Sequence, residues 1–237
     1  MKLVISLLLV TTSALARLPG SVITFASGGG VSGGSYAAIT FFGGSPPPSF
    51  TTFILDNFVG ADNTHLQDHT PDVGGAWVAE NANTLQILSN QLTGDSGATT
   101  IYVNDAGVDS GTLTFNLTLD ANQSELSMII GSTTTHGSAG WFVEILPWAG
   151  APTENVKFYE YTGVAYQGAV RHEFSAGPQV WKTVLNASAI SFYVNDVLIT
   201  SYANPTLHGT KWGFYNGGKG GGLPTESIFT KFQVTDE

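Results

Sequence analysis

Two glutamates of this chain have a spacing that could serve to cleave a glycosidic bond. An enzyme that cleaves glycosidic bonds places two carboxyl groups across the bond, one as acid and one as nucleophile or base. Glu144 in segment 141–146 and Glu160 in segment 155–161 could form such a pair on adjacent strands, because opposite residues in a sheet lie close together. A salt bridge or a solvated surface explains both glutamates more simply. We therefore assign no catalytic residue.

Histidines and loop aspartates are the candidate metal ligands. His65 and His69 are four residues apart, a spacing that suits zinc only on a helix, and Pro71 indicates a loop instead. No third ligand is evident, so the metal ligands are unknown and no cofactor is assigned. Calcium is a further candidate ion, but the loop carboxylates match no calcium-loop spacing: Asp105, Asp109 and Asp120.

Aromatic rings beside amide groups would suit sugar binding, because pyranose rings stack on aromatic faces while hydroxyl groups take hydrogen bonds. Trp148 is the best candidate, since segment 147–150 is typical of a turn that holds the ring at a loop tip. Tyr166, and Asn216 beside the glycine-rich segment 216–222, could join it. Alternatively, Trp148 covers an edge or a subunit contact. The remaining tryptophans are expected in the core: Trp77, Trp141, Trp181 and Trp212.

Charge and cysteine content exclude several classes of protein. The 237 residues carry a formal net charge of −10, and no local cluster of Lys or Arg offsets it. Such a chain repels phosphate backbones and anionic membranes, so we expect no nucleic-acid partner. The absence of cysteine removes disulfides, thiolate metal sites and cysteine nucleophiles. A hydrophobic content of 42% is ample for a core.

These candidate residues must be positioned by strands, because apolar residues alternate from residue 53 onward. In segment 111–119, four apolar residues point one way while threonines and an asparagine point the other. The pair Asn195-Asp196 predicts a two-residue hairpin turn, since both residues tolerate positive φ. No segment has a helical period. Further strands are predicted at 125–130, 140–146, 155–161, 179–185, 189–194, 211–215 and 227–235.

Three segments carry recognisable motifs: 56–77, which begins Asp56-Asn57-Phe58; 190–199; and 229–236. Together they resemble the concanavalin A-like lectin/glucanase superfamily, in particular laminin G-like modules of secreted and bacteriophage surface proteins. The resemblance covers roughly residues 53–237. It implies an all-β fold, a two-sheet antiparallel jelly-roll sandwich in which the first and last strands are neighbours. Glucanases of the superfamily carry a Glu-x-Asp-x-x-Glu or Glu-x-Asp-x-Glu strand, which this chain lacks, so we expect no enzyme.

The first fifty residues differ in composition and predict an extended N-terminal arm. Residues 1–16 combine Lys2, an apolar run and a small-residue end, which is the outline of a secretory signal peptide. The Gly/Ser-rich and Pro-rich segments that come next cannot build a core. We therefore divide the chain into an arm, 1–50, and a β-sandwich, 51–237. The first segment is either a signal with a disordered linker or an assembly arm that adds strands to a partner's sheet.

From these features we predict a non-enzymatic, lectin-like surface module that residues 1–50 display on a larger assembly. The resemblance implies a bacteriophage virion, where a structural or decoration protein stabilises the shell or attaches to glycans. Its partners would be virion subunits, a glycan ligand and copies of itself in a homo-oligomer, and its location the virion surface. The alternatives are a secreted carbohydrate-binding protein, processed after Ala16, and a glycan hydrolase or lyase on the same fold.

Overall fold

The computed structural model describes residues 49–79, 85–94, 100–120, 125–133, 139–147, 154–161, 165–217 and 227–236. The chain divides into two units, Met1–Ser49 and Phe50–Glu237. All but the last two residues of the predicted arm, and with them the signal-like segment 1–16, lie outside the described residues. Every described strand belongs to the second unit.

Strands dominate the described residues, joined by one short 3-10 helix. Their bounds are β1 (Thr52–Asp56), β2 (Thr64–His65), η1 (Leu66–Asp68), β3 (Val78–Ala79), β4 (Leu85–Leu88), β5 (Gln91–Gly94), β6 (Thr100–Asp105), β7 (Gly111–Leu119), β8 (Glu125–Ser132), β9 (Trp141–Ile145), β10 (Val156–Glu160), β11 (Ala165–Val170), β12 (Gly177–Leu185), β13 (Ala189–Val194), β14 (Val197–Ala203), β15 (Lys211–Gly217) and β16 (Ile228–Thr235). No helix in this part of the chain has the length and apolarity needed to cross a membrane.

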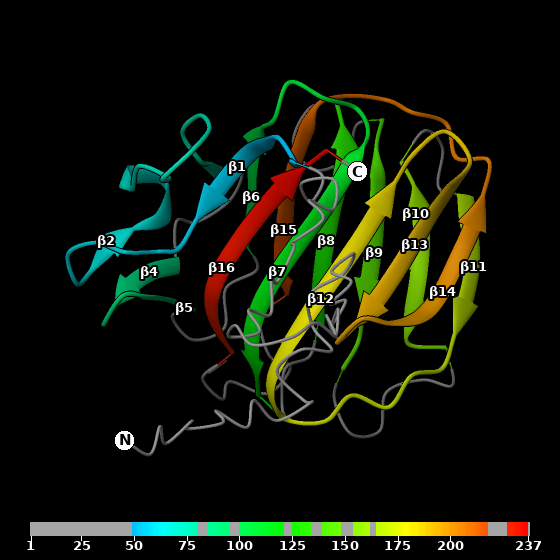
Figure 1. Cartoon of the computed structure of the whole chain (residues 1–237). Coiled ribbons are helices and arrows are strands. Elements are labelled where there is room, and N and C mark those ends of the chain that lie inside the picture. Colours follow the sequence, from blue (N-terminus) through cyan, green and yellow to red (C-terminus); the bar gives the residue numbers. More distant parts are fainter. Residues whose placement is uncertain are drawn as a thin grey trace, which may run out of the picture. The chain divides into compact units, whose positions relative to one another are not determined.

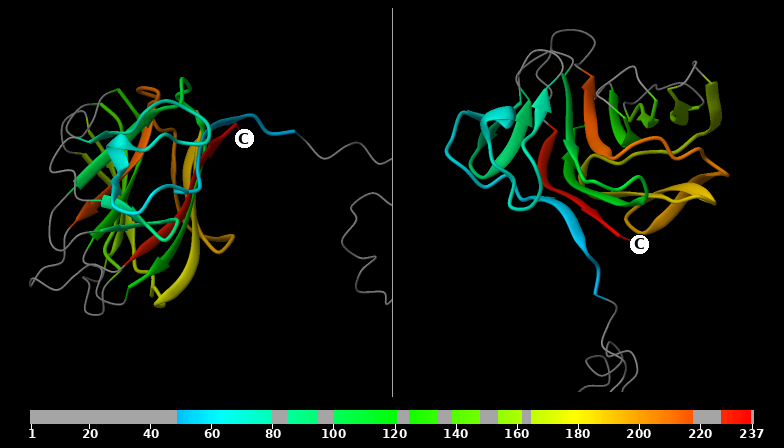
Figure 2. Two further views of the ribbon diagram at one scale, coloured as in Figure 1. Left: turned by 90° about the vertical axis from the view of Figure 1, so that its left-hand side faces the viewer. Right: turned by 90° about the horizontal axis from the view of Figure 1, so that it is seen from above.

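The strands form two antiparallel sheets that pack face to face (Figures 1 and 2). Sheet A has the order β14-β13-β12-β7-β16-β5-β4-β2, with β1 also paired to β16. Sheet B has the order β11-β10-β9-β8-β15-β6-β3. The fold is thus the two-sheet antiparallel jelly-roll sandwich that the family resemblance implies, built from the strands that the alternation predicts.

Alternation along the strands builds the core between the sheets. In β7, every second residue from Gly111 to Leu119 is buried and those between are half-buried, because side chains on a strand point to opposite faces in turn. Phe115 stacks on Phe229 of β16 with ring centroids 4.8 Å apart. The four tryptophans expected in the core are there, each at 3% exposure or less: Trp77, Trp141, Trp181 and Trp212.

Two local predictions are confirmed. β1 pairs with β16, and Asp56 lies opposite Phe232, so the first and last strands are neighbours. Asn195 and Asp196 have φ values of 50° and 63° and form the hairpin turn between β13 and β14.

The short strands β2 to β6 and the edge strand β11 were not predicted. In β6, Ile101, Tyr102 and Val103 are all buried, and a strand buried on both faces shows no alternation.

A buried carboxylate connects β1 to the loop after it. Asp56 is fully buried, and its Oδ1 accepts a hydrogen bond of 2.7 Å from the backbone N–H of Phe58. Its Oδ2 accepts a hydrogen bond of 2.7 Å from Nε1 of Trp77, and Nε2 of His69 lies 3.0 Å from Oδ1. Both oxygens are thus engaged, which a buried carboxylate requires. His69, a candidate metal ligand with His65 in the sequence, holds this carboxylate instead.

Asp56→Asn should destabilise the sandwich by about 2–3 kcal/mol, because an amide nitrogen would replace an oxygen that accepts from a buried donor. The exposed Asp68→Asn is the matched control and should change stability by less than about 0.5 kcal/mol. Urea unfolding followed by tryptophan fluorescence measures both variants. Equal stabilities for the two would contradict a structural role for Asp56.

Candidate functional site

Two of the three residues predicted to bind sugar, Tyr166 and Asn216, lie in strands of sheet B. Trp148 comes after β9 and lies outside the described residues. Tyr166 is in β11, where the backbone register sets it opposite Tyr159 of β10. Asn216 is in β15 and only 2% exposed, on the inner side of the sheet by alternation with Phe214. Asn216 is therefore not the surface contact we expected, while binding by Trp148 and Tyr166 stays a prediction.

Sheet B carries a second apolar cluster on the face that points away from sheet A. Neighbouring residues in the same strands, such as Tyr102 and Met128, belong to the core between the sheets, so alternation sends the second cluster outward. Half-buried tyrosines pack against it. The cluster and its tyrosines are Ile101, Val103, Ile129 and Phe142, with Tyr159, Tyr161 and Tyr215.

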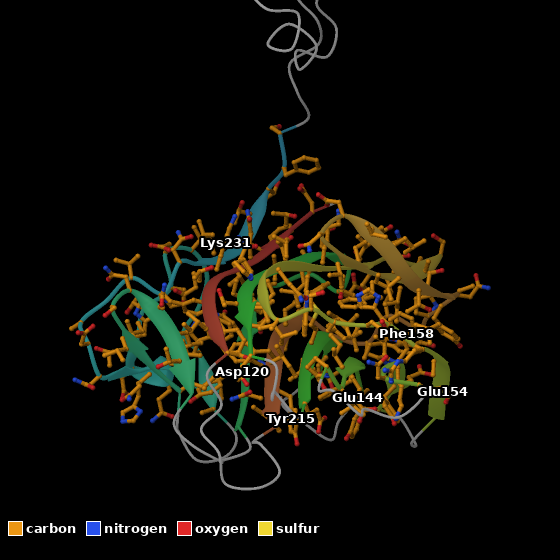
Figure 3. All side chains as sticks on the ribbon, turned by 90° about the horizontal axis from the view of Figure 1, so that it is seen from below. Asp120, Glu144, Glu154, Phe158, Tyr215 and Lys231 are labelled. Atoms are coloured by element: carbon orange, nitrogen blue, oxygen red, sulfur yellow. The ribbon has the colours of Figure 1, made fainter. Side chains whose placement is uncertain are left out.

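The stick view shows this outer face from one end of the sandwich (Figure 3). Glu144 and Tyr215 lie on the side of sheet B, whereas Lys231 lies on the side of sheet A. Phe142 and Tyr161 are in ring contact, with centroids 4.8 Å apart and planes inclined at 45°. The face therefore combines aromatic rings with carboxylate groups, which lie on strands except for Tyr161, directly after β10.

Two glutamates lie near each other on this face. Met128 of β8 pairs with Val143 of β9, and continuing that register by one residue sets Glu144 across from Ser127. The Ser127 hydroxyl donates to Oε1 of Glu125 at 3.4 Å. Glu125 is thus diagonal to Glu144, within the range over which residues on neighbouring strands interact.

The pair considered from the sequence, Glu144 with Glu160, does not form. Glu144 lies opposite Lys157 in the register of β9 and β10, and the Lys157 Nζ is 3.2 Å from its Oε2. Glu160 lies opposite Trp141, and its Oε1 is 2.9 Å from Nε2 of His208. Residues 157 and 160 are an odd number apart, so their side chains point to opposite faces of the strand.

Sequence reasoning missed Tyr159, Tyr161 and Tyr215, and it also missed Glu125. It begins a strand that was predicted at 125–130, and its alternation with Ser127 and Ile129 already placed it on one face with them. What the sequence did not provide was the strand order. Only the pairing of β8 with β9 brings Glu125 to Glu144.

Burial and neighbouring charges shift the pKa values of the ionisable side chains on this face. Burial, and then the charge of Glu144, raise the pKa of Glu125 to about 7. Burial also raises the pKa of Tyr159 and of Tyr161; Glu144 adds to both shifts, and Glu125 adds to that of Tyr161. Burial alone would lower the pKa of Lys157, but its hydrogen bond and attraction to Glu144 raise it overall. Near neutral pH, Glu125 can therefore donate or accept a hydrogen bond.

The described part of the chain offers no arrangement of side chains that would bind a metal ion. Those residues contain no group of three or more His, Asp or Glu side chains suited to hold an ion. Asp105, a loop candidate for calcium, accepts from the Thr210 hydroxyl at 2.7 Å and from the Gly107 N–H at 3.0 Å. These contacts, led by Thr210, lower the pKa of Asp105. Its carboxylate thus fixes the loop after β6.

Neither a protein-family model nor a curated protein matches this chain, but solved structures share its fold. The Bacillus licheniformis β-glucanase aligns at 14% identity over 81% of this chain and 100% of its own, with a TM-score of 0.52. A protein from work on endo-acting O-glycanases of the human gut microbiota aligns at 12% identity over 81% and 92%, with a TM-score of 0.54.

The laminarinase catalytic domain of Thermotoga maritima aligns at 10% identity over 80% of this chain and 99% of its own, with a TM-score of 0.51. The superpositions show a shared fold. At identities this low they show nothing about function, which must be argued from the site. The three likenesses show a shared jelly-roll sandwich fold, and membership of the concanavalin A-like superfamily stays a prediction. The laminin G-like subdivision stays a prediction.

Glu125→Gln tests the buried carboxyl group through stability. Folding raises the pKa of Glu125 from its usual 4.5 to about 7, so the unfolded chain releases this proton first. Between pH 4.5 and about 7, Glu125 therefore lowers the free energy of unfolding progressively as the pH rises. Above about pH 7 this loss of stability is complete and stays constant. Glu125→Gln should match the wild type at pH 4 and exceed it at pH 8 by roughly 1–2 kcal/mol, after allowance for solvent screening.

Urea unfolding at pH 4, 6 and 8 measures the effect, with the exposed Glu173→Gln as control. A stability difference that is the same at all three pH values would show that the Glu125 carboxyl does not change its pKa on folding.

Proposed function

We propose that the outer face of sheet B binds glycans without cleaving them. The contact residues are Glu125, Glu144, Tyr159, Tyr161 and Tyr215, which together we name the tyrosine–glutamate face. The observation that carries this proposal is the gathering of three half-buried tyrosine rings beside two carboxyl groups on a single sheet surface.

The chemistry of sugars matches this combination of groups. The apolar side of a pyranose ring stacks on an aromatic ring, while its hydroxyl groups donate to carboxylates and exchange hydrogen bonds with phenols. The tyrosines here pack on a buried apolar cluster, so little side-chain entropy remains to be lost when a ligand binds. Placement of Tyr159, Tyr215 and both glutamates on strands also fixes the spacing between their rings and carboxyl groups.

The three fold neighbours support the proposal by analogy only. Their names describe a β-glucanase, a laminarinase and endo-acting O-glycanases, and a fold hosts many activities. The residues on this face are therefore the stronger argument. Tyr166, predicted from the sequence, is a further candidate because its backbone lies in β11 of sheet B, opposite Tyr159; Trp148 stays a candidate from the sequence alone.

Tyr159→Ala should weaken binding of the glycan identified on an array by about tenfold, the effect of losing a ring contact worth about 1.4 kcal/mol. Tyr193→Ala is the matched control, because this half-buried tyrosine lies on β13 of sheet A, where it contacts Lys182. Calorimetric titration compares the two variants. A larger loss of affinity in Tyr193→Ala would move the binding surface to sheet A.

Glycan hydrolysis is the second candidate function, favoured by the raised pKa of Glu125. A glycosidase needs one carboxyl that is protonated near neutral pH and a second that is ionised. Glu125 has the pKa of such an acid, and Glu144 is ion-paired with Lys157. Binding without cleavage remains our proposal because the carboxyl pair of the superfamily's glucanase strand is absent from this sequence.

The wild-type protein should release no more reducing ends or unsaturated sugars from the bound glycan than the Glu125→Gln/Glu144→Gln double variant. A reducing-end assay and absorbance of unsaturated products measure this. Release by the wild type that either single substitution abolishes would overturn the non-enzymatic proposal, since the two groups would then be acting as an acid–base pair.

We further propose that residues 1–50 display the sandwich on a bacteriophage virion, as a structural or decoration protein. The supporting observations are the Gly- and Pro-rich composition of that segment and the resemblance of the sequence to modules of bacteriophage surface proteins. Deletion of residues 1–50 should abolish incorporation into particles while the sandwich stays folded, as judged by sedimentation and circular dichroism. Unchanged incorporation would favour the secreted alternative.

A further inference from the structure

We propose that the tyrosine–glutamate face selects glycans by charge. It accepts uncharged glycans and rejects those that carry uronate, sialate or sulfate groups, and Glu125 is the residue that determines this specificity. This inference rests on the proposed function and adds the class of ligand.

The charged side chains that lie together on the face determine the sign of its net charge. Glu125 and Glu144 lie on the neighbouring strands β8 and β9, and Lys157 of β10 lies beside Glu144 at 3.2 Å. Among the described residues, this local group thus holds two carboxyl groups and one ammonium. When Glu125 is ionised, the group carries a net negative charge. An anionic sugar stacked on the tyrosines would bring a further negative charge to it.

The directions of the pKa shifts on the face agree with this negative sign. At Glu125, the charge of Glu144 disfavours ionisation by more than Lys157 favours it. The same holds at Tyr159, where Glu144 again outweighs Lys157. At Tyr161, both glutamates disfavour a negative charge. A carboxylate or sulfate of a ligand would meet the repulsion that these groups meet.

The surroundings make this repulsion effective. The face lies on an apolar cluster whose members are at most 6% exposed, and charges interact more strongly where water is displaced by apolar groups. A glutamine at position 125 could still exchange hydrogen bonds with sugar hydroxyls. The carboxyl group therefore adds charge discrimination to a hydrogen-bonding role that a neutral side chain could also fill.

A glycan array with matched pairs tests the inference at pH 8, where Glu125 is ionised. Each pair presents one neutral backbone and the same backbone bearing sialic acid, sulfate or a uronic acid. The wild type should bind the neutral member about tenfold more strongly, as expected for one partly screened charge repulsion. Glu125→Gln should narrow that ratio. The exposed Glu173→Gln removes the same charge elsewhere and should leave the ratio unchanged.

Three results would overturn the inference. Equal or stronger binding of the acidic members by the wild type would refute charge selection while leaving glycan binding intact. An equal effect of the two substitutions would assign the discrimination to the overall charge of −10 and not to Glu125. Absence of binding to every glycan would refute the proposed function as well. Circular dichroism checks that each variant folds. If Glu125→Gln misfolds, Glu144→Gln replaces it in the test. That variant must narrow the ratio of neutral to acidic binding, because it leaves the positive charge of Lys157 uncompensated.

Discussion

Sheet B buries side chains on both of its faces, and the rest of the structure depends on this constraint. Its inner face packs against sheet A, while its outer face carries a separate apolar cluster. In β8, Leu126 and Met128 enter the core, and Glu125 and Ser127 alternate with them on the outside. A register slip of one residue would exchange the two sets and place a carboxyl group in the core. Core packing thus fixes where the glutamates lie, although they take no part in that core.

Two carboxyl groups, one buried and one half-buried, show how environment separates the structural role of Asp56 from the ligand-facing role that we propose for Glu125. Asp56 is fully buried, and three donors from its own segment of chain surround it, so its hydrogen-bonding capacity is used within the fold. Glu125 lies at the outer face, beside a hydroxyl group and a second glutamate, and its pKa rises to about 7. A perturbed carboxyl group on a surface is a common mark of a functional site, because the fold gains no stability from it. The tyrosines beside Glu125 supply the flat apolar surface that a sugar ring requires.

Much of the fold could be predicted from the sequence, and less of the site. The strand at Gly111–Leu119 and the turn at Asn195-Asp196 follow from local rules of alternation and positive φ, as did most of the longer strands. Strand β6 was missed because it is buried on both sides and shows no alternation. The site depends on which strands are neighbours, and a single sequence does not contain that information. Glu144 was recognised as a candidate, but its partners Lys157 and Glu125 follow only from the order of β8, β9 and β10. Asn216 was misplaced because its neighbourhood of glycines indicated a loop, whereas β15 continues through it and buries it.

A glycan should bind at the outer face of sheet B and at no other surface of the sandwich. Backbone amide chemical shifts, recorded by NMR while the glycan identified on an array is added, test this most directly. Binding at the tyrosine–glutamate face predicts that the largest perturbations fall in β8, β9, β10 and β15. Perturbations confined to the strands of sheet A, with those four strands unchanged, would contradict it.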